Sequence, residues 1–486
     1  MLKKLSRLKF DRKLIYFILI TLVFFGVFMR PEYALDSFCI LENQGDAIYD
    51  SFSQGRFLKG IFYILILKLN IGFGYKYIVS YLLSLFALVL AQFKLCRIIS
   101  KDIKNELLSI IISIMIILNP FSIELMMFYE KGVMCLGILF AIYAFDLFNK
   151  NMEKKKIKYF ILPSILMLLS DFSYQGISSI FIALSSIYIY KKSKNIKGFI
   201  INNIKMGLVY LIPALINVLI VRFIFVNTRV SGDVYIISTI SAIFDQLPVM
   251  FKFFDIIPYS ILLFVVYFIS FIAFAIFRNS NYKEKLLDVF SYLYVFLAMF
   301  LSTIAPQLLQ NTESVWLVPR STYAFAAIFG LTFLLIMLKR PKSKYFKNGL
   351  VVLSIIVLFV QGYSFIKIEI DHYALNYLDR INSYKIGDKI REYEEETGKR
   401  VKYISYSEDQ SKMYTYNGIR SRQDMNISGF SSDWSYRDMI NHYTGLKLKD
   451  KKATKEDMKR CSSSNSNDFN IDKIIIENDT VKFCGF

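Results

Sequence analysis

Apolar runs of membrane-crossing length recur along the first three quarters of the chain. A helix needs roughly 20 apolar residues to cross about 30 Å of hydrocarbon. Because 55% of the 486 residues are hydrophobic, a soluble fold could not cover its own surface. We therefore predict a mainly α, polytopic membrane protein with about eleven transmembrane helices. The expected spans are Leu14–Met29, Tyr77–Phe93, Leu107–Ser122, Val133–Phe148, Tyr159–Ser170, Gly176–Tyr190, Met206–Val226, Tyr259–Phe277, Leu286–Ala305, Thr322–Leu338 and Gly349–Ile366.

Charge predicts the topology. The first span follows a basic segment and ends at Arg30-Pro31 without a small-residue cleavage site, which indicates an uncleaved signal anchor with a cytoplasmic N-terminus. If the apolar stretch Phe57–Phe73 lies in the interface or re-enters, cytoplasmic segments hold about 28 Lys/Arg residues and outer loops about 9. If it crosses, the strongly basic loops fall outside. The first topology obeys the positive-inside rule, and the formal charge of +20 then needs no nucleic acid partner.

The composition changes near residue 367. Residues 1–366 form the predicted multi-span domain, with a first outer loop at 30–76, in the cytoplasmic (plasma) membrane. Residues 367–486 are polar and charged, and an odd number of spans places them outside. Mixed helix and strand patterns predict a small extracytoplasmic α+β domain, with a helix at Tyr384–Thr397 and strands at Arg400–Tyr406 and Lys473–Ile476.

The cysteines give no metal-binding pattern. Cys461 and Cys484 both lie in the predicted outer domain, where oxidation is permitted, so a disulfide between them is one alternative. There is no CxxC motif and no Cys/His cluster, and we expect neither a metal nor a cofactor.

The outer loop after the first span is acidic in a basic protein. Asp36 lies a few residues past the membrane edge, where a carboxylate in a low-dielectric site can act as a general base. A solvated loop acid is the alternative interpretation. We predict Asp36 as the catalytic residue and Glu42 and Asp46 as substrate contacts. The five carboxylates of this loop are Glu32, Asp36, Glu42, Asp46 and Asp50.

Two arginines at the predicted outer surface could bind phosphate. Gly55 before Arg56 lets backbone and guanidinium approach an anion closely. Arg320 follows Pro319 at the mouth of the tenth span, where its guanidinium could hold a lipid phosphate through bidentate hydrogen bonds. The alternative for both is an arginine that snorkels at the membrane edge.

Two adjacent pairs complete the predicted binding residues. Glu130 and Lys131 in the second outer loop could bind sugar hydroxyls and a phosphate, or could simply be solvated. Tyr174 and Gln175 at the outer end of the fifth span suit stacking and hydrogen bonding to a sugar. An interfacial aromatic belt is the alternative for Tyr174.

Common nucleotide and nucleophile signatures are absent. The sequence has no P-loop, no GxGxxG after a strand and no nucleophile elbow. Nucleotide sugars are scarce outside the cytoplasm, so a transferase that faces outward would need a lipid-linked donor.

The chain resembles the GtrII-like glucosyltransferases, which belong to the GT-C class of polytopic glycosyltransferases. The resemblance rests on the order of short motifs in an anchored, multi-span chain with a soluble tail. Many family members have adjacent acids where this chain has one, which leaves open whether Asp36 acts alone or with Glu42 or Asp46. The motifs are Leu35-Asp36-Ser37, Ser53-Gln54-Gly55-Arg56-Phe57-Leu58, Tyr174-Gln175 and Pro319-Arg320.

The resemblance implies a GT-C-like fold and a metal-independent, inverting transfer. A hexose, expected to be glucose, would pass from a polyprenyl-phosphate donor to a cell-surface polysaccharide or teichoic acid on the outer face of the membrane. Asp36 matches the catalytic acid of the first outer loop. The implied partners are the lipid donor, the surface glycan acceptor, membrane lipid, a donor-synthesising transferase and a flippase.

Two other classes remain as alternatives. A transporter or flippase of lipid-linked glycans would carry charges deep inside several spans and an internal repeat. A polysaccharide polymerase or ligase would place its main arginines in two large outer loops.

Overall fold

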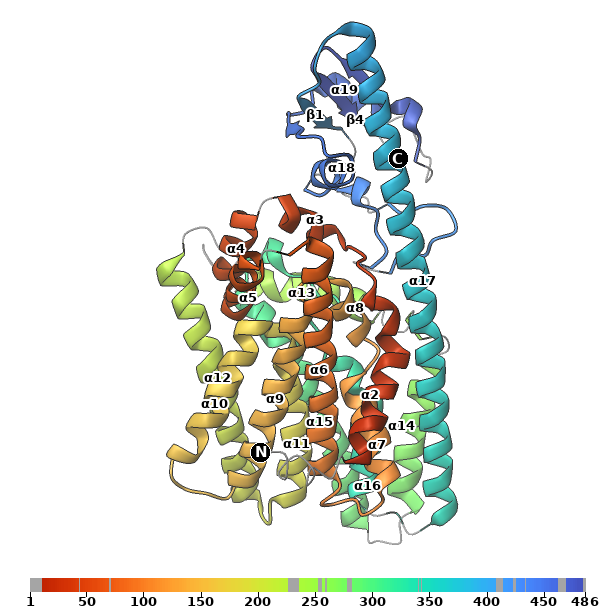
Figure 1. The fold of residues 1–486 in the computed structure, drawn as a ribbon. Coiled ribbons are helices and arrows are strands. Elements are labelled where there is room, and N and C mark those ends of the chain that lie inside the picture. The colour runs from red at the N-terminus through yellow and green to blue at the C-terminus, as the bar shows by residue number, and fades with distance from the viewer. Residues whose placement is uncertain are drawn as a thin grey trace, which may run out of the picture.

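Helices make up most of the described structure, and a small sheet lies near the C-terminus (Figure 1). The computed structural model describes residues 11–42, 44–69, 71–225, 236–251, 256–257, 260–277, 282–339, 341, 343–407, 414–422, 425–432, 434–461 and 469–483.

The α-helices are α2 (Arg12–Phe25), α3 (Leu35–Glu42), α4 (Gln44–Ser53), α5 (Phe57–Lys68), α6 (Phe73–Ile99), α7 (Glu106–Ile117), α8 (Ser122–Met127), α9 (Lys131–Asn151), α10 (Lys158–Ser173), α11 (Ser179–Lys192), α12 (Ile196–Ile224), α13 (Ile236–Phe251), α14 (Ser260–Phe277), α15 (Tyr282–Ile304), α16 (Ile328–Leu338), α17 (Lys344–Thr397), α18 (Tyr436–Thr444) and α19 (Lys455–Cys461). The 3₁₀ turns are η1 (Gly26–Met29), η2 (Gln175–Ile177), η4 (Ala305–Leu309), η5 (Thr312–Ser314), η6 (Phe325–Ala327), η7 (Gly429–Ser431) and η8 (Ile471–Lys473). The strands are β1 (Tyr403–Tyr406), β2 (Lys449–Asp450), β3 (Ile475–Glu477) and β4 (Thr480–Phe483).

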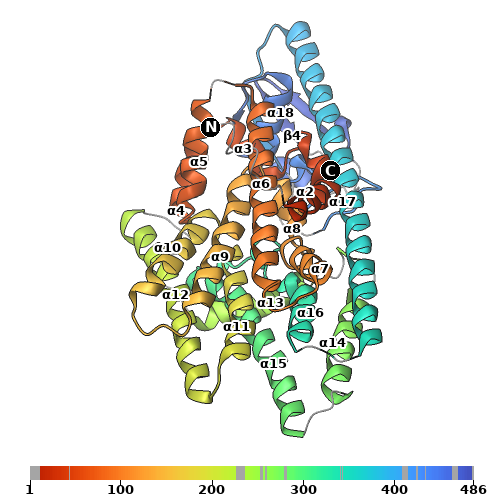
Figure 2. The same ribbon diagram turned by 60° about the horizontal axis from the view of Figure 1, so that its bottom comes forward.

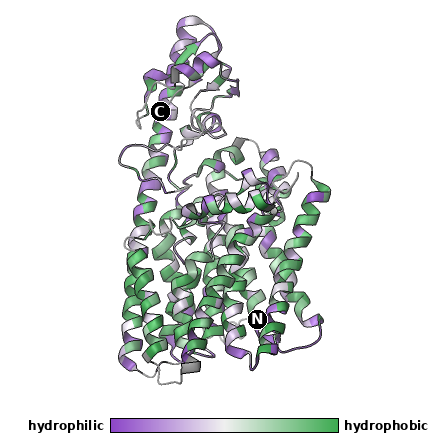
Figure 3. Cartoon of the chain, turned by 180° about the vertical axis from the view of Figure 1, so that it is seen from behind, coloured by the Kyte–Doolittle hydropathy of each residue, from purple (hydrophilic) through white to green (hydrophobic). Residues whose placement is uncertain are grey.

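Six helical segments of the described chain are long and apolar enough to cross a membrane. Each of the eleven apolar runs lies wholly or mostly in a helix, but the count of eleven crossings stays a prediction. Hydrophobic residues predominate in the helical bundle, and hydrophilic residues are more frequent in the C-terminal region (Figure 3). The length and composition of these helices therefore suggest a multi-pass membrane protein. The six segments are Arg12–Met29, Phe73–Ile99, Lys131–Asn151, Ile196–Ile224, Lys285–Leu308 and Lys344–Thr397.

Helices α2 and α6 run antiparallel and pack against each other. The Tyr81 hydroxyl donates to the Phe25 carbonyl at 3.0 Å, and the Gln92 amide donates to the Thr21 hydroxyl at 2.9 Å. The segment between these helices, which includes α5, thus leaves and re-enters the bundle at the same end. This is the arrangement that the charge tally favours for Phe57–Phe73.

The basic connections gather at the opposite end of the bundle. The α6–α7, α9–α10 and α11–α12 connections all lie at the end remote from the C-terminal region (Figure 1). Their placement on one side agrees with the predicted topology, whereas the membrane face that this side meets stays a prediction.

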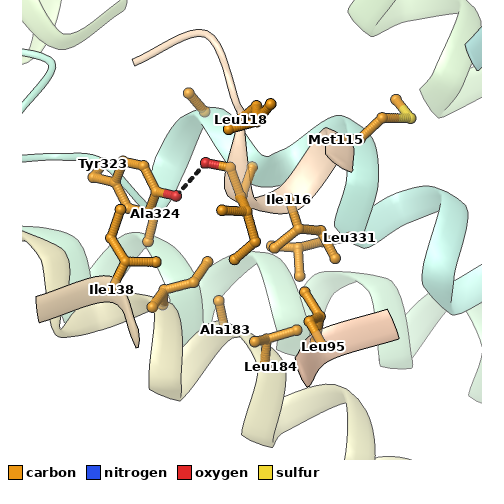
Figure 4. Packing of buried hydrophobic residues seen from close by; sticks show 14 of the residues in the cluster. Leu95, Met115, Ile116, Leu118, Ile138, Ala183, Leu184, Tyr323, Ala324 and Leu331 are labelled. Atoms are coloured by element: carbon orange, nitrogen blue, oxygen red, sulfur yellow. Dashed lines mark hydrogen bonds between the residues drawn. The ribbon is translucent and has the colours of Figure 1, made fainter. Parts of the chain in front are cut away.

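The bundle core is built from aliphatic and aromatic side chains of neighbouring helices. Helices α6, α9 and α11 lie side by side (Figure 2). Leu95, Ile116, Ile138 and Leu184 belong to one buried cluster in the interior, each 0% exposed (Figure 4). The buried Tyr323 hydroxyl donates to the Ile117 carbonyl at 2.5 Å, which satisfies a polar group that burial would otherwise penalise.

Helix α17 continues from the bundle into the C-terminal region without a break. It has no proline, and it begins where the Ser343 side chain accepts the Phe346 N–H at 3.2 Å. It ends at Gly398, whose left-handed φ of 66° suits a glycine C-cap. The predicted domain boundary at residues 366 and 367 lies inside this helix.

The C-terminal region contains a mixed four-stranded sheet in the order β2-β1-β4-β3. Strand β1 pairs in parallel with β2 and β4, and β3 pairs antiparallel with β4. The predicted mixture of helix and strand is confirmed, with β1 inside the range Arg400–Tyr406 and β3 overlapping Lys473–Ile476. Cys484 and the side chain of Cys461 lie outside the described residues.

Helix α3 joins the two parts of the molecule. Phe38, 2% exposed, belongs to the core of the C-terminal region together with Leu375 and Ile386. Ile40 packs in a separate cluster with Tyr63 and other side chains of α5 and α6. Two apolar clusters therefore hold α3 from both sides.

Replacing Phe38 tests this joint. We expect Phe38→Ala to lower the free energy of unfolding by about 3–5 kcal/mol, because it empties a buried aromatic site. Thermal unfolding of the full chain in detergent micelles measures the change. Phe223→Ala is the matched control, since Phe223 is 82% exposed. Equal unfolding temperatures for the two variants would contradict the assignment of α3 as a structural joint.

Candidate functional site

A cavity of about 850 Å³ lies at the end of the bundle that carries the C-terminal region. Its wall combines α3, α4 and α5, the η2 turn, residues 306–321 and parts of the C-terminal region. Seven predicted site residues line it: Asp36, Asp46, Arg56, Glu130, Tyr174, Gln175 and Arg320. Their roles are untouched by this placement and stay predictions.

Asp36 lies exposed in the first turn of α3. Within the described residues its carboxylate has no hydrogen-bond or ion-pair partner. Phe38 and Ile40 fix the helix that carries it, and the Cys39 thiol adds a hydrogen bond to the Trp434 carbonyl at 2.5 Å. A carboxylate held in this way at a cavity wall is available to accept a proton.

Arg56 follows a tight turn between α4 and α5. Gly55 has a φ of 72° and a Cβ there would collide with Asn217, so the turn requires glycine. The Gln175 amide donates to the Gln54 carbonyl at 2.8 Å, and the Arg56 guanidinium lies 4.4 Å from the centre of the Tyr174 ring. The predicted pair Tyr174-Gln175 thus positions the arginine.

The charge of Arg56 is not neutralised in the described part of the chain. No ion pair of Arg56 occurs there, and its buried Nε lacks a hydrogen-bond partner. A guanidinium on an aromatic ring, with donors left over, is suited to an anion such as phosphate.

Lys59 and Glu130 form a buried ion pair beside Arg56. The Lys59 ammonium lies 2.5 Å from Glu130 Oε1, and the Tyr63 hydroxyl donates to Glu130 Oε2 at 3.0 Å. Burial lowers the pKa of Lys59, and the Arg56 charge lowers it further, while Glu130 opposes both. Burial opposes ionisation of Glu130, but the Lys59 ammonium and the Tyr63 hydroxyl hold the pKa of Glu130 below its ordinary value.

Arg320 is paired with a carboxylate that the motifs did not indicate. Glu124 of α8, which is fully buried, accepts hydrogen bonds from both the backbone N–H and the guanidinium of Arg320. The guanidinium also lies 4.4 Å from the centre of the Phe128 ring. This bidentate pair fixes Arg320 at the cavity wall.

Three predicted site residues remain to be described: Lys131, Asp46, which lines the cavity, and Glu42. Lys131 is fully buried, is bonded to the Tyr77 hydroxyl and is not part of the cavity wall. Its ammonium lies 3.6 Å from the centre of the Tyr77 ring. Asp46 is exposed in the first turn of α4. The side chain of Glu42 lies outside the described residues.

Further residues of the wall were missed by sequence reasoning. Lys59 is the one charged residue in an apolar stretch of the sequence, and this isolation could have indicated it. The same signal could have indicated Glu124, which is not in the wall but pairs with the wall residue Arg320. No local sequence pattern indicated that residues of the C-terminal region would line the cavity. The missed wall residues with charged or aromatic side chains include Lys59, Glu313, Trp316, Trp434, Arg437, Asp438 and Asp450.

The described residues contain no group of three His, Cys, Asp or Glu side chains that could hold a metal ion. The wall instead offers an unpaired carboxylate, an arginine without a counter-ion and several hydrogen-bonding groups. These suit proton acceptance and anion binding in one cavity.

No family model matches the chain, and neither a curated protein nor a solved structure matches it. The geometry of the cavity and the sequence motifs therefore carry the functional argument alone.

Removing Glu130 tests the buried pair. We expect Glu130→Gln to lower the free energy of unfolding by about 3–5 kcal/mol, because Lys59 would keep an uncompensated buried charge. The loss should be largest near neutral pH and should shrink in acid, because protonation of Glu130 then leaves Lys59 unpaired in the unmodified protein as well. In alkali the loss also shrinks as Lys59 of the variant gives up its proton. Without Glu130 the pKa of Lys59 falls further below its unfolded value, so the unfolded state binds more protons and stability rises with pH.

Thermal unfolding across pH in detergent micelles measures this effect. The exposed Glu392→Gln is the matched control, and Lys59→Met combined with Glu130→Gln should recover most of the loss. A Glu130→Gln variant with the stability and pH dependence of the unmodified protein would rule out a compensating ion pair.

Proposed function

We propose that this protein is a membrane glycosyltransferase of GT-C type. It moves a hexosyl group, expected to be glucosyl, from a polyprenyl-phosphate donor to a cell-surface polysaccharide or teichoic acid. The cavity would open on the outer face of the cytoplasmic membrane, with eleven spans below it. The carrying observation is that an unpaired carboxylate, Asp36, and an arginine without a counter-ion, Arg56, line one cavity at the end of an apolar bundle.

The donor side of the cavity is assigned to Arg56. A polyprenyl-phosphate sugar is a phosphodiester, and its lipid phosphate gains one negative charge when the bond to the sugar breaks. Arg56, fixed by Tyr174 and by the turn at Gly55, can stabilise that developing charge without a metal ion. Lys59 and Arg320 already hold carboxylate partners, so they contribute less positive charge.

The acceptor side is assigned to Asp36. The acceptor oxygen forms a bond to the anomeric carbon as the bond from that carbon to the phosphate oxygen breaks. The acceptor hydroxyl proton passes to the Asp36 carboxylate, and the phosphate leaves with the electron pair. A single displacement inverts the anomeric configuration, as in other inverting sugar transfers.

Replacing Asp36 tests the assignment of the base. We expect Asp36→Asn to lower the transfer rate by roughly 10²- to 10⁴-fold, because the amide cannot accept the proton. The assay follows radiolabelled sugar from polyprenyl-phosphate glucose to host surface glycan, with the full chain in nanodiscs. Asp388→Asn is the matched control, since Asp388 is an exposed acid of α17 outside the cavity wall.

A fully active Asp36→Asn enzyme would remove Asp36 from the chemistry. Movement of the intact lipid-linked sugar across the bilayer, without transfer to a glycan, would favour the flippase alternative. Joining of whole glycan chains rather than single sugars would favour the polymerase or ligase.

Replacing Arg56 tests the phosphate contact. We expect Arg56→Gln to lower kcat by roughly 10²- to 10³-fold, because the charge on the leaving phosphate loses its stabilising partner. Arg56→Lys should retain part of the rate, and the exposed Arg400→Gln should retain all of it. If Arg56→Gln changes only the acceptor KM, the donor phosphate does not lie at Arg56.

A further inference from the structure

The C-terminal region supplies one side of the cavity. Trp434, Arg437, Asp438 and Asp450 line it, and they are here called the α18 wall because three of them lie in or just before α18. Helix α18 packs against α3, which carries Asp36. The α18 wall is therefore part of the same cavity as the proposed base, although it lies about 400 residues further along the chain.

The charge of Arg437 is satisfied within the α18 wall. Its Nε donates to Asp438 Oδ1 at 2.7 Å, and its guanidinium also pairs with Asp450. The Tyr436 hydroxyl donates to Asp450 at 3.1 Å. Two carboxylates thus surround one arginine, and the α18 wall carries excess negative charge.

One oxygen of this cluster lacks a partner. Asp438 is 1% exposed, lines the cavity, and has no hydrogen-bond partner for Oδ2 among the described residues, because the neighbouring Cys39 thiol donates its hydrogen to the Trp434 carbonyl. A buried carboxylate oxygen without a partner is costly unless a ligand or water occupies it. Trp434 beside it is 47% exposed, so its ring is available for contact.

Asp36 is linked electrostatically to both sides of the cavity. Burial, together with the Asp438 and Asp36 carboxylates, raises the pKa of Cys39 to about 12. Asp36 also acts on Lys59, the neighbour of Arg56. The proposed base thus lies near enough to both the phosphate-binding side and the α18 wall to act on charged groups in each.

The described residues of the cavity wall carry more acidic than basic side chains, in a basic protein. Seven carboxylates and four basic side chains are among its lining residues, whereas the chain carries a formal charge of +20. A polyanion with repeated phosphates would be repelled there, whereas an uncharged ligand would not.

We propose that the α18 wall is the acceptor subsite and that it takes a neutral, hydroxyl-rich saccharide chain rather than a polyanionic teichoic acid. Trp434 offers its ring to the apolar face of a sugar, and Asp438 Oδ2 accepts a hydrogen bond from a sugar hydroxyl. The acceptor hydroxyl then meets Asp36 within the cavity that Arg56 also lines. This assignment rests on the proposed transfer function and narrows its acceptor to one class.

The two tryptophans of the chain make the subsite directly measurable. Trp316 and Trp434 both line the cavity, and the sequence has no other tryptophan. Emission of the full chain in nanodiscs is titrated with two probes, a phosphate-free polysaccharide fraction of the host cell surface and poly(glycerol phosphate). Trp316→Phe isolates the signal of Trp434, and Trp434→Phe isolates that of Trp316.

We expect the phosphate-free polysaccharide to change the emission of Trp316→Phe, with an affinity that salt hardly alters. Sedimentation with labelled polysaccharide should show roughly ten- to hundredfold weaker binding for Trp434→Ala and for Asp438→Asn. The control Asp388→Asn should bind normally. Tighter binding of poly(glycerol phosphate), unchanged binding by both α18-wall variants, or no binding of either probe would overturn the proposal.

Transfer assays separate this proposal from the function on which it rests. If transfer occurs and the α18-wall variants leave the acceptor KM unchanged, the acceptor subsite fails and the transfer function stands. If the variants lose polysaccharide binding but the unmodified protein transfers no sugar, the saccharide site stands and the transfer function fails.

Discussion

The packing of α3 between two apolar clusters is the interaction on which the candidate site depends. Phe38 belongs to the core of the C-terminal region, and Ile40 belongs to the cluster built on α5 and α6. Two side chains two positions apart point to different partners because a short helix turns about 100° per residue. Asp36 on the same helix is thereby held at the junction, where the bundle and the C-terminal region both contribute residues to the cavity wall.

Charge in the cavity is organised by pairing. Lys59 is matched by Glu130, Arg320 by Glu124, and Arg437 by Asp438. An unmatched cation in a weakly solvated site is expensive, so each pair removes most of that cost. Arg56 differs, since an aromatic ring and no carboxylate supports it in the described structure. That contrast is the physical basis for assigning it to an anionic ligand.

The sequence predicted the helices well because a membrane-spanning helix is recognisable as a long apolar run. Seven of the residues that it proposed for the site line the cavity, since short connections at one end of a bundle must lie near one another, and their roles stay predictions. Lys131 shows the limit of that reasoning. It adjoins Glu130 in sequence, yet the start of α9 turns it toward Tyr77 and away from the cavity wall. The α18 wall could not be predicted, for a different reason. Its contact with α3 joins segments about 400 residues apart, and no local sequence pattern encodes such a contact.

Because α17 is one unbroken helix, a change in its tilt within the bundle also moves the C-terminal region at its far end. The 54 residues of α17 extend about 80 Å as one helix. A rod of that length that tilts by about 5° in the bilayer moves its far end by about 7 Å relative to its near end. The thickness of the surrounding membrane, which sets the tilt of α17, therefore acts on the packing contact between α3 and α18. The shape of the cavity becomes a property of the protein and its lipid together.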